Sequence, residues 1–278
     1  AGTGATFSVS NNDDTAVVVD TVNILAAQNV GISISGNTEV VDGTATYPLH
    51  ASVTTGAITS KSSGASTTIT LDGNTGVDGG DGDSVVTVDG TIDVTSEVNV
   101  TTSISGNSYA NIDLGGTAAE DEAKREVKLA ASGSNTLVMA RNTGATMALA
   151  STTLAAQAAA DVLIGGNTNS DENNSSTVTL VDLSVTSAED LARFAITFNE
   201  ADAGEGNGNT VMVAGPLKVE GAAAIVTVSD NDNLEANIAA TSGSLNTLTI
   251  DATPEPLGDS DAELVVARNE DSIVRLGN

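Results

Sequence analysis

The chain has 278 residues, of which 37 are acidic and 9 are basic, so its formal net charge is -28. Such a surface repels phosphate, which excludes nucleic-acid binding and attachment to an anionic membrane from the expected functions. The chain has no cysteine and one histidine, His50, which excludes disulfides, cysteine nucleophiles and histidine clusters for zinc. It also lacks an apolar run of the roughly 20 residues that cross a bilayer, so no membrane insertion is expected.

The hydrophobic residues are small. They make up 40% of the chain, but aromatic residues make up only 2%. The core is therefore expected to be aliphatic, built mainly from Ala, Val, Leu and Ile.

An internal repeat organises the chain. Seven groups of residues recur in the same order at a nearly constant offset, which is the signature of a tandem duplication. The pairs are 25–28 with 154–157, 34–38 with 164–168, 52–55 with 184–187, 69–72 with 196–199, 88–90 with 213–215, 107–112 with 233–238, and 137–142 with 264–269. Residues 7–17 also resemble residues 264–274. The repeat predicts two tandem β-domains, 1–136 and 137–263, and a partial third unit at 264–278.

The local signals are mostly β. Short runs rich in Val, Ile and Thr, separated by Gly, Asn and Asp, predict strands. The clearest are 67–71, 84–88, 92–94, 177–180, 210–213 and 247–250. We therefore expect a mainly β fold of two duplicated domains, sandwich-like, with a solenoid as the alternative.

A few short helices are also expected. Thr117 and Glu120 form a capping box ahead of a predicted helix over residues 118–131. Residues 154–161 and 187–194 are predicted to add one or two helical turns each.

The densest acidic cluster predicts a calcium site. Calcium prefers six to eight oxygen ligands from a flexible turn, and the glycines of this segment allow the chain to curve. The candidate ligands are Asp72, Asn74, Asp78, Asp81 and Asp83. The alternative is a solvated hairpin loop, because the segment departs from the EF-hand and from the nonapeptide calcium repeat.

Three further groups of residues could have a functional role, but their residue types also suit ordinary turns and loops. Residues 11–14 and 230–233 are rich in Asn and Asp, which suit turns as well as cations. Asn99, Asn173 and Asn174 match the N-glycosylation sequon. His50 is expected in a loop.

An enzyme is not expected. Paired carboxylates suit glycoside hydrolysis, but sugar sites usually stack the ring on aromatic side chains, which are scarce here. No Gly-x-Ser-x-Gly motif is present either.

The composition, the repeat and the strand spacing resemble bacterial and archaeal surface-layer proteins, extracellular filament subunits and tandem β-domain adhesins. This resemblance implies an exported structural subunit, located at the cell surface or outside the cell, that self-assembles and depends on calcium. The expected partners are copies of the chain itself and cell-surface glycans. The alternative is an adhesin or a carbohydrate-binding stalk.

The partial third unit raises a separate question. A β segment over residues 264–276 would leave backbone groups unpaired, and such an edge is normally covered or paired. It can fold onto the second unit, or it can pair with the next molecule and produce a head-to-tail polymer.

Overall fold

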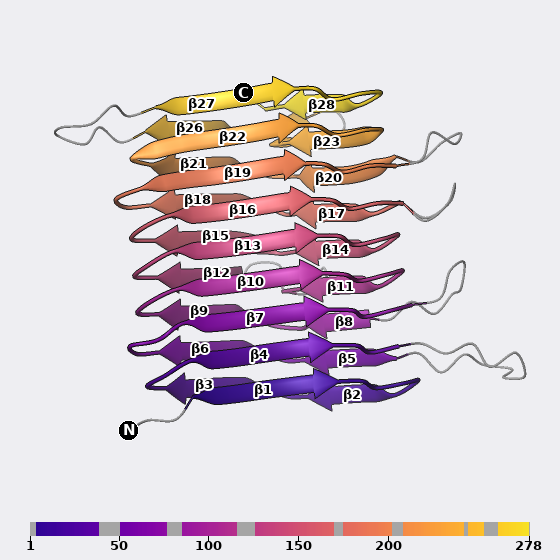
Figure 1. Ribbon diagram of the computed structural model, residues 1–278, viewed down its shortest axis with the longest axis vertical. Helices are drawn as coiled ribbons and strands as arrows, with labels where there is room; N and C mark the ends of the chain where they lie inside the picture. The colour runs from indigo at the N-terminus through magenta and orange to yellow at the C-terminus, as the bar shows by residue number, and fades with distance from the viewer. Residues whose placement is uncertain are drawn as a thin grey trace, which may run out of the picture.

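The computed structural model describes residues 4–38, 51–76, 85–115, 126–169, 175–201, 208–241, 244–252 and 261–277. These residues form a column of stacked strands, in which three long parallel sheets enclose one core (Figure 1). The mainly β prediction is confirmed. The arrangement is a solenoid, so the expected sandwich is wrong and the alternative holds.

Each turn of the solenoid, here called a coil, contributes one strand to each sheet. Sheet 1 contains β1 (Ala5–Ser10), β4 (Val30–Ser35), β7 (Thr67–Asp72), β10 (Val100–Ser105), β13 (Asn135–Ala140), β16 (Ala160–Gly165), β19 (Leu191–Thr197), β22 (Ala223–Ser229) and β27 (Ala262–Ala267). Sheet 2 contains β2 (Ala16–Val19), β5 (Ser52–Thr55), β8 (Val85–Val88), β11 (Asn111–Leu114), β14 (Thr146–Leu149), β17 (Thr177–Leu180), β20 (Asn209–Val213), β23 (Leu234–Ile238) and β28 (Ile273–Leu276). Sheet 3 contains β3 (Val22–Ala26), β6 (Ile58–Ser62), β9 (Ile92–Ser96), β12 (Glu126–Ala131), β15 (Ser151–Ala156), β18 (Leu183–Ser187), β21 (Leu217–Gly221) and β26 (Leu248–Ala252).

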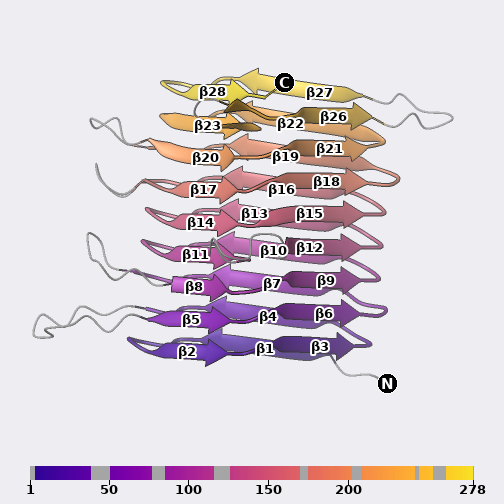
Figure 2. The ribbon, with the colours of Figure 1, turned by 180° about the vertical axis from the view of Figure 1, so that it is seen from behind.

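The coils are numbered 1 to 9 from the N-terminal end, and β1 and β27 lie at opposite ends of the column (Figures 1 and 2). The described part of coil 9 contributes to sheets 1 and 2, so sheet 3 ends at β26 in coil 8. A short antiparallel pair, β24 (Ala240–Thr241) and β25 (Ser244–Leu245), lies outside the three sheets. Coil length varies along the column, because Ala5 pairs with Val30 whereas Ala224 pairs with the more distant Ala262.

Along each strand, residues that point into the core alternate with residues that point outward. In β13, Leu137 and Met139 are fully buried, whereas Val138 between them is only partly buried. Because parallel strands pair in register, inward side chains form rows along the column. One row contains Phe7, Ile32, Ile69, Thr102, Leu137, Val162, Phe194, Val226 and Leu264. Aliphatic side chains therefore fill most of the interior, and Phe194 is the largest fully buried side chain among the described residues.

The predicted helices are absent from the described residues. Residues 126–131 form β12, in which Val127, Leu129 and Ala131 are buried and alternate with Glu126 and Lys128. Residues 154–161 belong to the end of β15 and the start of β16, and residues 187–194 to β18 and β19. Parallel neighbours on both sides supply backbone hydrogen bonds along each strand, and this tertiary pairing overrides the local helix signal. The capping residues Thr117 and Glu120 lie outside the described residues. No described helix could span a membrane.

The repeat found in the sequence corresponds to four coils. Gly166, Asn167 and Thr168 lie four coils above Gly36, Asn37 and Thr38, and the match of 137–142 with 264–269 is also in register. The predicted domain boundaries, 136/137 and 263/264, fall inside β13 and β27, two strands of one continuous sheet. The four-coil duplication stays a hypothesis about the history of the sequence.

Val88 and Val213 also occupy equivalent positions in sheet 2, four coils apart, but some of the other matches are out of register. Ser52 lies in sheet 2 and Ser184 in sheet 3, so this pair is not equivalent. Leu25 is 79% exposed, whereas its predicted counterpart Leu154 is fully buried. A shift of one residue places a side chain on the opposite face of a strand, which explains the difference.

Candidate functional site

The corner between sheets 1 and 2 holds the most regular polar structure of the molecule. In every described coil, one asparagine follows a residue with positive φ and turns its side chain into the interior. The asparagines are Asn12, Asn37, Asn74, Asn107, Asn142, Asn167, Asn199, Asn231 and Asn269, and we call them the asparagine ladder. The positive-φ residue is glycine in four coils, as at Gly106 (φ 66°), which relieves the steric cost of this conformation.

Each ladder asparagine from Asn12 to Asn231 donates a side-chain hydrogen bond to the asparagine of the next coil, in the direction of the C-terminal end. Asn142 Oδ1 accepts from the backbone amide of Asn107 at 3.1 Å and from Asn107 Nδ2 at 2.9 Å. Asn142 Nδ2 donates to Asn167 Oδ1 at 2.9 Å and to the Ile104 carbonyl at 3.1 Å. Each ladder amide from Asn74 to Asn231 likewise has its oxygen and both N–H groups satisfied, as burial requires. The sequence predicts turns around Asn12 and Asn231 and a calcium ligand at Asn74, and it does not connect these residues with the other ladder asparagines. Their spacing varies with coil length, which hides the pattern.

Asn74 of the predicted calcium site is a member of this ladder. It is fully buried, and its Oδ1 accepts from the backbone amide and Nδ2 of Asn37 at 3.3 and 2.7 Å. Ligation of a calcium ion by this oxygen would compete with those bonds. Asp72 is exposed at the end of β7, and Asp78, Asp81 and Asp83 lie outside the described residues. The calcium site stays a prediction. Within the described ranges, no three His, Cys, Asp or Glu side chains are grouped so as to hold a metal.

The other Asx-rich segments occupy the same corner. Asn11 and Asp14 in coil 1, and Asp230 and Asn233 in coil 8, have positive φ, as tight turns require. Asn12 and Asn231 are ladder members. These segments therefore have the turn geometry.

One sequon residue is described. Asn99 is exposed, and its Oδ1 accepts a hydrogen bond from the Ser134 amide at 2.8 Å. Asn173, Asn174 and His50 lie outside the described residues. Glycosylation stays a prediction at all three asparagines.

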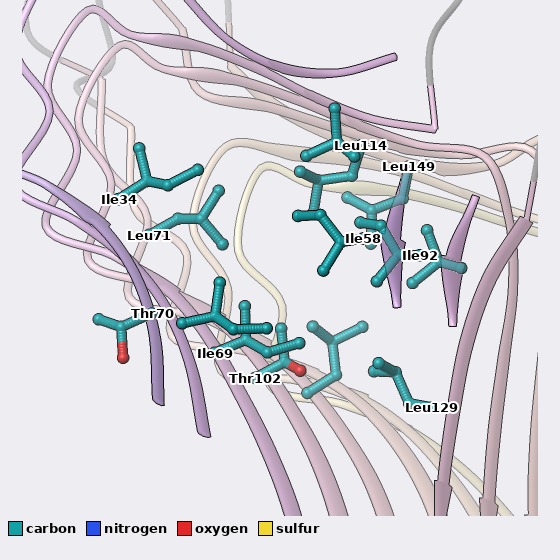
Figure 3. A pocket seen from close by; sticks show the side chains of 14 residues that line it. Ile34, Ile58, Ile69, Thr70, Leu71, Ile92, Thr102, Leu114, Leu129 and Leu149 are labelled. Atoms are coloured by element: carbon teal, nitrogen blue, oxygen red, sulfur yellow. The ribbon is translucent and has the colours of Figure 1, made fainter. Parts of the chain in front are cut away.

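A small apolar cavity lies in the interior (Figure 3). Its volume is about 20 Å³, which is room for a single water molecule. Ile, Leu and Val side chains dominate its wall, where the buried Thr102 hydroxyl lacks a hydrogen-bond partner in the described structure. An open depression of about 270 Å³ lies on sheet 3, lined by small side chains such as Ala130, Ala155 and Ser96. Neither cavity brings carboxylates, a nucleophile or a base together from the described residues.

Acidic side chains of coil 8 fasten coil 9 to the column. Arg268 binds both carboxylate oxygens of Asp230, and Arg275 binds Glu235 and Asn237. The hydrogen bond from Arg268 lowers the pKa of Asp230. Hydrogen bonds from Asn237 and Arg275 lower the pKa of Glu235. These carboxylates therefore stay ionised to a somewhat lower pH than ordinary Asp and Glu side chains.

The two ends of the column expose apolar side chains. In coil 1, the inward-facing Phe7 and Val17 are only partly buried, whereas their neighbours Ile32 and Val53 in coil 2 are buried. In coil 9, the inward-facing Leu264 and Val266 are 44% and 47% exposed, whereas their neighbours Val226 and Val228 in coil 8 are fully buried. In the described structure, β1 pairs only with β4, and β27 pairs only with β22. These ends are the surfaces on which strand pairing can continue, and they form the candidate functional site.

The comparisons add no relative to this description. No protein-family model, no curated protein and no solved structure matches the chain. Function must therefore be inferred from the geometry of the chain itself.

Proposed function

We propose that this chain is an exported structural subunit that self-assembles into a cell-surface layer or an extracellular filament. The observation that carries the proposal is the uninterrupted parallel column, which repeats one coil-on-coil interface along its length and, among the described residues, leaves the outer edges of β1 and β27 unpaired. Sheet edges of this kind are templates for pairing with another chain.

The composition supports the same proposal. A net charge of -28 keeps single molecules soluble, and a chain without cysteine folds independently of redox conditions. With aromatic residues at 2% of the chain, few rings are present on which a sugar could stack, which favours a structural role over a glycan-binding one. We propose that the principal partner is another copy of the chain, outside the cell, with cell-surface glycans as a second partner.

Electron microscopy of the purified chain, with calcium and with chelator, tests this function. A structural subunit forms long or regular objects as its concentration rises, and calcium lowers the concentration required. An adhesin or glycan-binding stalk remains a set of separate rods under every condition, and that result would replace the proposal with its alternative.

A further inference from the structure

Building on the proposed function, we infer that assembly occurs by stacking coil 9 of one molecule on coil 1 of the next. In this junction β27 pairs with β1 and β28 pairs with β2, and the asparagine ladder continues from Asn269 to Asn12 of the second copy. The occupant of each end is thus the opposite end of an identical chain. The argument rests on continuity with the coil-on-coil interface that already repeats within the molecule.

The outer edge of β1 offers an ordered set of backbone groups. In a parallel sheet, both backbone groups of alternate residues point to the same neighbouring strand. The amides of Ala5 and Asn11 donate to carbonyls of coil 2. The backbone groups of Thr6, Ser8 and Ser10 consequently point to the opposite edge, away from coil 2.

The outer edge of β27 offers the matching set. The carbonyls of Asp261 and Ala267 accept hydrogen bonds from amides in coil 8. By the same alternation, the backbone groups of Ala262, Leu264 and Val266 point away from coil 8. Strands β1 and β27 run in the same direction (Figure 1). In the register found inside the chain, Leu264 donates to Thr6 and accepts from Ser8 of the next copy.

The ends of the asparagine ladder are also complementary. Asn12 Nδ2 donates to Asn37 Oδ1 at 2.7 Å, but no described residue donates to Asn12 Oδ1. At the other end, Asn269 Nδ2 donates to the Val228 carbonyl at 3.0 Å, which uses one of its two hydrogens. The remaining hydrogen of Asn269 and the oxygen of Asn12 form the bond that joins adjacent coils throughout the column.

The side chains fit the same register. Stacking places Leu264 on Phe7, and Val266 on Val9, within rows that are continuous inside each molecule. Val274 similarly lies on Val17 across the sheet 2 junction. The junction therefore covers apolar side chains that are partly exposed in the separate molecule. Sheet 3 stops at β26, so sheets 1 and 2 make the junction.

The negative charge of the chain determines the salt concentration at which stacking is expected. Within the chain, Glu270 forms an isolated parallel β-bridge with Asp232 of the coil below. In the junction, Asp13 of the next copy takes the corresponding position on the other side of Glu270. The junction therefore adds an acid-on-acid contact between two strongly negative molecules. Salt or divalent cations screen this repulsion, so we expect stacking to strengthen with ionic strength.

Ser8→Pro tests the junction, with Ser8→Ala as the matched control. Ser8 is exposed, and its backbone amide faces the outer edge of β1, where proline is tolerated. Proline removes this donor and obstructs the approaching strand, while the bonds from β1 to β4 remain. Sedimentation of the 278-residue chain over a range of concentrations and salt measures assembly, and circular dichroism checks that each variant is folded.

We expect wild type and Ser8→Ala to assemble alike, and Ser8→Pro to need a concentration about tenfold higher or more, as loss of one or more hydrogen bonds implies. Because Ser8→Pro alters only the coil 1 end, its coil 9 end should still stack on coil 1 of a wild-type molecule. A small proportion of the variant mixed with wild type should therefore stop rod growth and shorten the rods. Equal assembly of wild type and the folded proline variant would overturn the junction and leave the proposed function standing. Wild type that stays monomeric at every concentration and salt would overturn both.

Discussion

Asn107 donates from Nδ2 to Oδ1 of Asn142, 2.9 Å away and 35 residues later in the chain. This contact is one step of a chain of buried amides that marks the same corner of each coil. Buried amides are costly unless they are satisfied, so the ladder fixes which residues stack on one another. A coil displaced by one or two residues would remove an asparagine from the ladder and leave its neighbours without partners.

The ladder predicts a large effect of Asn142→Leu. Leucine fills a similar volume but leaves the backbone amide and one Nδ2 hydrogen of Asn107 without an acceptor, so we expect a loss of about 3 kcal/mol or more in unfolding free energy. Asn111→Leu is the control, because Asn111 is exposed on β11 and should change stability by less than about 0.5 kcal/mol. Urea unfolding compares the two. Equal effects would show that the ladder contributes nothing specific.

Thr102→Val should stabilise the protein. The Thr102 hydroxyl is buried in an apolar row without a described partner, and valine replaces it with a methyl group of similar size. We expect a gain of about 1 kcal/mol in thermal unfolding experiments. Thr101→Val, on the exposed face of the same strand, should be nearly neutral. A loss of stability at Thr102 would mean that a buried water satisfies this hydroxyl.

The attachment of coil 9 should weaken in acid. The pKa of Glu235 is lowered by Asn237 and Arg275, so its pairing contributes fully above the ordinary pKa of 4.5 and is lost as the pH falls through the lower folded value. We expect Arg275→Gln to cost about 0.5 kcal/mol at pH 7, since the pair is partly exposed, and almost nothing at pH 2. Hydrogen exchange of β28 amides measures both. A cost that is independent of pH would contradict the ion-pair explanation.

Calcium should raise the melting temperature if the predicted site exists. Binding to the folded state adds about 2.7 kcal/mol at a hundredfold excess over Kd. Replacing Asp78, Asp81 and Asp83 together by Asn should abolish the increase, and magnesium at equal ionic strength controls for screening of the net charge. An identical melting temperature in millimolar calcium and in chelator would refute the site.

The sequence contains enough information for the β class and for part of the repeat. The matches of Gly36, Asn37 and Thr38 with Gly166, Asn167 and Thr168 are in register because a positive-φ residue and a ladder asparagine are required there. The pairing of Ser52 with Ser184 is wrong because alternating Val and Thr occur in every sheet, so similar segments need not be equivalent.

The solenoid could not be separated from a sandwich by these signals. Both folds use short strands in which inward and outward residues alternate. The length of the coils varies, so the repeat of one coil is hidden in the sequence. Asn12 and Asn37 are separated by 25 positions in the chain, for example, whereas Asn231 and Asn269 are separated by 38.

The ladder was missed for a related reason. Its positive-φ residue is glycine at Gly36, Gly73, Gly106 and Gly166, but other residue types in the remaining coils. A common motif therefore emerges only once the coils are aligned in space.

Electron diffraction or cryo-electron microscopy of assembled material tests the central claim most directly. Coils stack about 4.8 Å apart, so nine coils give an axial repeat of about 43 Å per molecule in an end-to-end rod. The account predicts both spacings along the rod axis, with strands perpendicular to that axis. An assembly in which columns lie side by side, without the inter-strand spacing continuing across molecules, would contradict it.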